Sequence, residues 1–255
     1  HEPVLPHTLS VLAWLVQLET AVLDGEPPQT GPIQEAREAL ADWAAPLQAY
    51  IGREVAGGVN GRLLLRLGAL FHDVGKRDTI KVEENGRIHF YGHETVGAKL
   101  TARRLRQLTF SNQAITHVQT IVAGHMRPLH LVNTGQYNPS RRTIYRFFQA
   151  TGEAGLDICL LTLADHLATF AGAGQNWSAL LTLVRHLLQA WFEQAEEVVT
   201  PPPLLNGHEL MSALNLPPGP EIGRLLRLIA EGQAAGEIRT REEALKFARQ
   251  VAGTG

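Results

Sequence analysis

The densest group of residues able to do chemistry in this sequence is Phe71-His72-Asp73-Val74-Gly75-Lys76. It follows the apolar run Leu63–Leu70, so His72 and Asp73 are expected near the C-terminal end of a largely buried helix. Buried imidazole and carboxylate groups need partners. Two side chains about 100° apart on one helix can converge on one cation, and a carboxylate can bridge two. A His-Asp dipeptide alone is more often a surface pair or a helix cap. Its interpretation as a metal site therefore depends on other ligand-type residues in the chain.

Four further side chains of the kind that bind metals interrupt apolar stripes elsewhere: His7, His93, His125 and Asp165. Taken singly, each is explained as well or better as a helix cap, a core histidine or a satisfied acid on a helix face. Taken together, they would leave polar groups in several apolar helices, and each unpaired group would cost about 1 to 3 kcal/mol. One shared metal site would satisfy all of them. The pattern therefore predicts such a site.

The elements that must position these residues are helices. Apolar residues recur every three or four positions, the spacing of buried or amphipathic helices, in Leu5–Leu23, Ile33–Ile51, Leu63–Leu70, Val96–Leu108, Ile115–Val122, Ile144–Phe148, Leu156–Phe170 and Leu180–Phe192. The one good strand signal is Ile80–Phe90, where Asn85-Gly86 favours a tight hairpin turn. We therefore expect an all-α fold with a short β-hairpin at most. The prolines 201–203 cannot continue a helix, so we predict a domain over residues 1–199 and a small helical appendage over 200–255.

The motifs resemble a known family. His7, His72-Asp73 and Asp165 follow the H…HD…D order of the HD phosphohydrolase superfamily. More narrowly, the sequence looks like the C-terminal half of bacterial tRNA nucleotidyltransferase and poly(A) polymerase family proteins. The stretches that carry this resemblance are 71–76, 92–98, 125–128, 152–157, 206–211 and 218–223. The likeness spans nearly the whole chain, and it departs at Arg77, where the family usually has proline.

The resemblance implies an HD-domain helical bundle that binds a divalent ion. Its primary ligands would be His7, His72, Asp73 and Asp165, while His93 and His125 resemble the histidines that hold a second metal in parts of the superfamily. One or two ions are expected, and mixed imidazole and carboxylate ligands suit Mn, Fe, Ni, Zn or Mg equally.

Several charged residues follow closely on these ligand positions. We expect Lys76, Arg77 and Arg127 to hold the substrate phosphate, with ordinary surface solvation as an equally good explanation. With Asp73, they are the residues we assign to catalysis. Glu94 is expected to orient His93.

Two functions from different classes follow. The first is hydrolysis of phosphomonoesters or cyclic phosphodiesters of nucleotides or RNA ends. The second is a non-catalytic body that binds tRNA or another RNA for a nucleotidyltransferase head, with Arg103, Arg104, Arg106, Arg141, Arg142 and Arg146 as a phosphate track. The family's head has no counterpart here, and the helical pattern begins almost at His1, so we expect a missing upstream part. A domain that senses nucleotides without hydrolysis ranks last, because binding alone needs no full set of metal ligands.

Composition limits the partners. The 255 residues are 44% hydrophobic, which is enough for a full core, and the net charge of −2 provides no general field that attracts nucleic acid. Any RNA contact must come from a local patch. The single cysteine, Cys159, lies in an apolar run, so no disulfide or thiolate cluster can form and a reducing cytoplasm is expected. No stretch approaches the ~20 apolar residues that cross a bilayer, so no membrane partner is expected.

Overall fold

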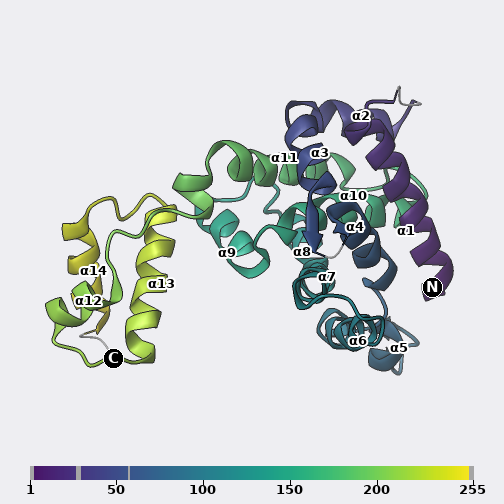
Figure 1. Ribbon diagram of the computed structural model, residues 1–255. Coiled ribbons are helices and arrows are strands. Elements are labelled where there is room, and N and C mark those ends of the chain that lie inside the picture. The colour runs from purple at the N-terminus through teal and green to yellow at the C-terminus, as the bar shows by residue number, and fades with distance from the viewer. Residues whose placement is uncertain (1–2, 27–29, 57, 253–255) are drawn as a thin grey trace. The chain divides into compact units, whose positions relative to one another are not determined.

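The computed structural model of the protein describes residues 3–26, 30–56 and 58–252, and helices dominate it (Figure 1). The expectation of an all-α fold is confirmed. The chain divides into two compact units: unit 1 contains residues 1–138 and 151–188, and unit 2 contains residues 139–150 and 189–255. This division differs from the boundary expected at residue 200, because residues 139–150 and 189–199 pack with the C-terminal part.

Unit 1 consists of helices and two small ribbons. Its elements are α1 (Val4–Leu18), η1 (Glu19–Leu23), α2 (Pro32–Leu40), η2 (Ala41–Trp43), α3 (Ala44–Gly52), β1 (Glu54–Ala56), β2 (Val59–Asn60), α4 (Gly61–Phe71), α5 (Lys76–Thr79), β3 (Lys81–Val82), β4 (Ile88–His89), α6 (His93–Gln107), α7 (Asn112–Gly124), α8 (Met126–Asn133), α10 (Ala154–Phe170) and most of α11 (Trp177–Glu193).

Helix α10 is the centre of unit 1. Every residue from Ala154 to Ala168 is buried, which fits a sequence that is apolar nearly all round. Helices α1, α4, α7 and α8 all contact it. The end of α7 comes especially close, because a Cβ at Gly124 would lie only 2.6 Å from Ile158 Cδ1. Elements that are distant in sequence are thus brought around one helix.

Local sequence signals start the helices that lead to the site. Asn60 begins α4, and its Oδ1 accepts a hydrogen bond from the Leu63 amide at 2.9 Å. Ser111 begins α7 in the same way, with Oγ accepting from the Ala114 amide at 3.2 Å. Helix α6 packs on α4 and α7 through buried apolar side chains that include Leu64, Leu105 and Val118.

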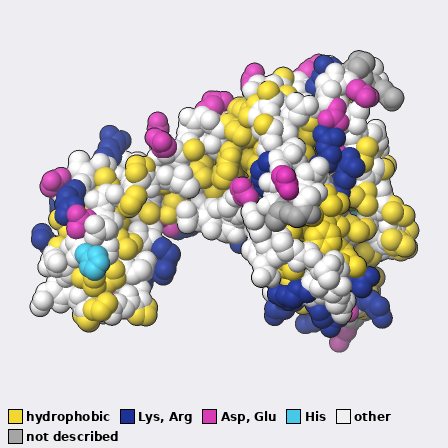
Figure 2. Space-filling model, in the orientation of Figure 1, with side chains coloured by type: hydrophobic (Ala, Val, Ile, Leu, Met, Phe, Trp, Pro, Cys, Tyr) yellow, Lys and Arg dark blue, Asp and Glu magenta, His cyan; other side chains and the backbone are white. Residues whose placement is uncertain are grey.

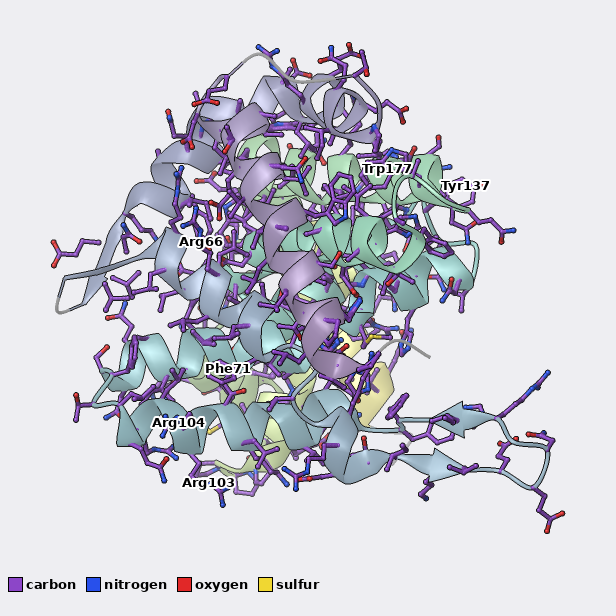
Figure 3. All side chains as sticks on the ribbon, turned by 90° about the vertical axis from the view of Figure 1, so that its right-hand side faces the viewer. Arg66, Phe71, Arg103, Arg104, Tyr137 and Trp177 are labelled. Atoms are coloured by element: carbon purple, nitrogen blue, oxygen red, sulfur yellow. The ribbon has the colours of Figure 1, made fainter. Side chains whose placement is uncertain are left out.

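The expected hairpin is present between α5 and α6. Strands β3 and β4 pair antiparallel, and Gly86 in the turn adopts a left-handed conformation with φ of 79°. The hairpin projects from unit 1 (Figure 3). A second small ribbon, β1 with β2, was not expected, because two or three paired residues leave no detectable alternation in the sequence.

Unit 2 has its own core. Its elements are α9 (Arg141–Thr151, less its last residue), the end of α11, η3 (Ala195–Val199), α12 (Gly207–Leu214), α13 (Pro220–Ala234) and α14 (Arg241–Ala252). Leu210, Leu225 and Ile229 are central to the apolar cluster that holds α12, α13 and α14 together. In the part of the chain that the structure describes, no helix is long and apolar enough to span a membrane.

Candidate metal centre

The structure brings all six predicted ligands together. They come from separate elements: His7 from α1, His72 and Asp73 just after α4, His93 from the start of α6, His125 between α7 and α8, and Asp165 from α10. Each of the six is less than a tenth exposed. Six polar side chains gathered in the interior of a helical unit are costly to bury unless they satisfy one another or a bound cation.

One half of the cluster consists of His7, His72 and Asp165, whose potential ligand atoms all lie within 4.8 Å of one another. His7 Nε2 lies 2.9 Å from Asp165 Oδ1, and His72 Nε2 lies 3.9 Å from the same oxygen. Two imidazole nitrogens and a carboxylate oxygen facing one point form a donor set that suits a divalent transition metal.

The other half consists of Asp73, His93 and His125, again with ligand atoms within 4.8 Å of one another. Asp73 Oδ1 lies 3.4 Å from His93 Nε2 and 3.8 Å from His125 Nε2. The two imidazole nitrogens are 3.2 Å apart.

Asp73 belongs to both halves. Its second oxygen, Oδ2, lies 3.3 Å from His72 Nε2 and 3.7 Å from His7 Nε2. One carboxylate therefore directs Oδ2 to the first half and Oδ1 to the second. This is the arrangement that a bridging carboxylate requires between two ions.

Backbone carbonyls fix the orientation of three of the rings. In His72, His93 and His125, Nδ1 lies 2.7, 2.9 and 2.7 Å from the carbonyl oxygen three residues earlier. A carbonyl only accepts, so each Nδ1 carries a proton and donates it, and in the neutral ring Nε2 bears a lone pair.

Those lone pairs point into the cluster. The Nε2 atoms of His93 and His125 face each other without a proton to share when both rings are neutral, and His72 Nε2 is buried without a hydrogen bond. Cations held by the two halves would satisfy all three atoms. The residues therefore fit a divalent metal.

The charge states of Asp73, Asp165 and His125 match those of metal ligands. Burial opposes ionisation of Asp73 and Asp165, but the neighbouring histidines outweigh it and hold the pKa of both carboxyls below the ordinary value. Burial, assisted by the charge of His72, lowers the pKa of His125 to about 4, so this ring is neutral at pH 7. Burial opposes charge on His72 too, yet Asp73 and Asp165 raise its pKa overall. The carboxylates thus favour a positive charge at the centre.

A glycine sets the distance between the two segments that carry Asp73 and His93. A Cβ at Gly75 would lie 2.1 Å from the His93 carbonyl oxygen and 2.6 Å from the Gly97 amide nitrogen. Side chains larger than hydrogen cannot fit there without moving the backbone. This close backbone contact explains why the His-Asp-Val-Gly-Lys stretch has glycine at position 75.

The residues expected to bind phosphate differ in position. Lys76 Nζ lies 2.5 Å from Asp73 Oδ2 and lines a pocket of about 320 Å³ beside the cluster, together with His7, Asp73 and Asp165. Arg77 and Arg127 are exposed and are not among its lining residues, so their role stays a prediction. Glu94 Oε2 lies 3.5 Å from His93 Nδ1, farther than the Phe90 carbonyl oxygen at 2.9 Å, so the backbone provides the main orientation of His93.

The remaining walls of the pocket were not predicted. They are Val4, Met126, Leu129 and Thr169. Three of them could have been found by helix periodicity, because Val4, Leu129 and Thr169 lie three or four residues, about one turn, from His7, His125 and Asp165. They make the pocket partly apolar.

The arginines expected to form one phosphate track fall into two classes. Arg141, Arg142 and Arg146 on α9 are paired with glutamates of unit 2: Arg141 with Glu197, and both Arg142 and Arg146 with Glu231. Their charges are neutralised locally, so this half of the expected track is not supported. Arg103, Arg104 and Arg106 on α6 are exposed.

The chain is similar to known proteins whose names describe nucleotide addition to tRNA. A family model described as tRNA nucleotidyltransferase domain 2 (putative) matches residues 95–248. A CC-adding tRNA nucleotidyltransferase of Thermus thermophilus is 36% identical over 187 residues, which cover 71% of this chain and 38% of the relative. An A-adding tRNA nucleotidyltransferase of Deinococcus radiodurans is 35% identical over 193 residues, 74% of this chain and 42% of the relative.

The matches have two limits. The chain spans about two fifths of the length of these curated relatives. The family model begins after His93, so of the six candidate ligands it contains only His125 and Asp165. It nevertheless matches well over half of the chain, and the chain therefore belongs to the tRNA nucleotidyltransferase domain 2 family.

Proposed function

We propose that the chain is a metal-dependent phosphohydrolase of the HD superfamily that acts on phosphomonoesters or cyclic phosphodiesters of nucleotides or RNA ends. The main support is the convergence of six buried ligand-type side chains around Asp73, among which the Nε2 atoms of His72, His93 and His125 carry lone pairs without a proton donor when the rings are neutral. Two divalent ions would satisfy these three atoms.

The protein's own residues would have separate roles in binding the ions, binding the phosphate and excluding water. His7, His72 and Asp165 would hold one ion, His93 and His125 the other, and Asp73 both. A bound divalent ion supplies Lewis acidity toward a phosphoryl oxygen and toward water. Lys76, at the wall of the pocket, would bind a phosphate oxygen and balance its charge. The apolar walls at Val4 and Leu129 would exclude bulk water and strengthen these charge interactions.

The pocket supports a small phosphoester. About 320 Å³ is at the low end of ligand pockets in proteins, so it fits a phosphorylated sugar or the terminal nucleotide of a chain, and not a folded RNA. Only the end of an RNA would enter, with the rest bound outside.

The test is metal content followed by turnover. Purified protein would be stripped with a chelator, reloaded separately with Mn²⁺, Ni²⁺, Zn²⁺ and Mg²⁺, and assayed on phosphomonoesters and 2′,3′-cyclic nucleotides. We expect Asp73→Ala to lose both the ions and turnover, while Asp78→Asn, which removes an exposed carboxylate five residues away, keeps both. Undiminished hydrolysis by Asp73→Ala would refute the assignment.

A second candidate is a non-catalytic RNA-binding body that serves a nucleotidyltransferase head. The observation that favours it is the family itself: the chain matches about two fifths of relatives whose names describe nucleotide addition to tRNA. RNA binding without metal-stimulated hydrolysis of any tested ester would support the non-catalytic RNA-binding function.

A further inference from the structure

Lys76 contacts the same carboxylate oxygen that the first half of the metal centre faces. Its amide donates to the Asp73 carbonyl oxygen at 2.9 Å where α5 begins, and its side chain reaches back so that Nζ lies 2.5 Å from Asp73 Oδ2. His72 Nε2 and His7 Nε2 lie 3.3 and 3.7 Å from this oxygen. The Lys76 ammonium and the ring nitrogens of the first half therefore share one acceptor.

A divalent ion and the Lys76 ammonium cannot both use this oxygen without cost. An ion held by His7, His72 and Asp165 would bind Asp73 through Oδ2 when that carboxylate bridges the two halves. The ammonium, 2.5 Å from the same oxygen, would then be a close neighbour of like charge. The Asp73 side chain is only 3% exposed, so water screens this repulsion poorly. The ion and the ammonium therefore compete for Asp73 Oδ2.

The structure offers Lys76 another position close by. Its Nζ lies 5.6 Å from the centroid of the Phe90 ring, within the distance of a cation–π contact. Lys76 also lines the pocket of about 320 Å³, and its flexible side chain is partly exposed, so it has room to move. An ammonium that leaves Asp73 Oδ2 therefore keeps a favourable neighbour and stays at the wall of the pocket.

We propose that Lys76 is a counter-ion of Asp73 that a divalent ion must displace, and that the displaced ammonium turns into the pocket to bind the substrate phosphate. Metal binding and phosphate binding are then coupled, because the phosphate-binding charge is released only when the ion is in place. The competition for Asp73 rests on the contacts of the structure, whereas the coupling to substrate rests on the proposed function.

The test measures the affinity for Mn²⁺ alone, without phosphate or substrate. Protein stripped with a chelator would be titrated with Mn²⁺ at about 0.15 M salt, and free Mn²⁺ would be followed by its electron paramagnetic resonance signal. Lys76→Met keeps a flexible side chain and removes the charge. A charge within about 4 to 6 Å shifts an equilibrium at a carboxylate about 10- to 1000-fold. The product of the stepwise Mn²⁺ binding constants should therefore rise at least about tenfold in Lys76→Met.

A charge-matched control is needed because other cations lie nearby. Figure 2 shows Lys and Arg side chains gathered over α5 and α6. Arg77→Met removes the next cation of α5, which is exposed and does not line the pocket. Its Mn²⁺ affinity should stay within about fivefold of wild type, because solvent and salt screen an exposed charge. An equal gain in both variants, or no gain in Lys76→Met, would overturn the proposal.

The position of the ammonium is a second readout, and it does not depend on any variant. In crystals of the wild type soaked with Mn²⁺, we expect an ion on Asp73 Oδ2 and Lys76 Nζ beyond the roughly 4 Å limit of an ion pair from that oxygen. An ion on Asp73 Oδ2 with Lys76 Nζ still hydrogen-bonded to the same oxygen would overturn the proposal.

The outcomes also distinguish this inference from the proposed function. Equal Mn²⁺ affinity in wild type and Lys76→Met, with metal-dependent hydrolysis of a phosphomonoester by the wild type, would overturn the competition and leave the hydrolase standing. Tighter Mn²⁺ binding by Lys76→Met, without hydrolysis of any tested ester by the wild type, would support the competition and refute the hydrolase. Mn²⁺ binding by neither protein would refute both.

Discussion

Gly75→Ala should separate the two halves of the metal centre. The added Cβ would lie 2.1 Å from the His93 carbonyl oxygen, and ordinary contacts begin near 3.4 Å, so the backbones must part by about 1.3 Å. Metal–ligand distances tolerate only about 0.2 Å. His93 would therefore move out of reach of the ion that it shares with His125 and Asp73 Oδ1, while His7, His72 and Asp165 stay in place. Overpacking of this kind costs about 1 to 3 kcal/mol.

The assay counts ions per chain. Protein reconstituted with Mn²⁺ and freed of excess metal would be measured by mass spectrometry, with thermal unfolding in parallel. We expect two ions for wild type and one for Gly75→Ala, with a melting temperature lowered by about 2 to 12 °C. Gly52→Ala is the control, because no atom lies within 4 Å of its added Cβ. Two ions and an unchanged melting temperature in Gly75→Ala would refute the reasoning.

Further predictions concern the pocket and the core. Lys76→Met should lower kcat/KM about 10- to 1000-fold while metal content is kept, since it removes a phosphate-binding charge; an unchanged kcat/KM would contradict this. Thr169→Leu should narrow the pocket and raise KM more than it lowers kcat in steady-state assays. Tyr50→Phe removes the hydrogen bond from Tyr50 to Asp157, 2.5 Å long, and should destabilise unit 1 by about 1 to 3 kcal/mol in urea without changing metal content. Cys159 is fully buried and burial raises its pKa, so a thiol reagent should react only when the protein is unfolded; rapid reaction of the native protein would contradict the fold.

The sequence indicated which residues gather at the centre but not how they divide. Ligand-type side chains inside apolar helices are detectable from periodicity alone, as His7, His125 and Asp165 illustrate. The division of labour of Asp73, with one oxygen for each half, depends on where α1 and α6 pass the end of α4. The positions of α1 and α6 relative to α4 result from packing between segments that are far apart in sequence. Local sequence patterns cannot predict this packing.

The arginines show a second limit of the sequence, which does not reveal which charged side chains find partners in the fold. Arg106 and Arg146 look alike in sequence, since each lies on a charged helix face. Arg146 is paired with Glu231, 85 residues away along the chain, whereas Arg106 has no such partner among the described residues. The amino-acid composition alone does not distinguish the paired guanidinium group from the unpaired one. Likewise, the run of prolines at 201–203 suggested a boundary, but α9 joins unit 2 because its arginines and its aromatic Phe148 meet partners there, including Trp191.

Anomalous diffraction from crystals of the protein soaked in Mn²⁺ tests the central claim most directly. The account predicts two peaks, one in contact with His7, His72 and Asp165 and one with His93 and His125, with the Asp73 carboxylate between them. An anomalous map without a peak at these side chains, with the rings of His7 and His72 turned away from each other, would contradict it.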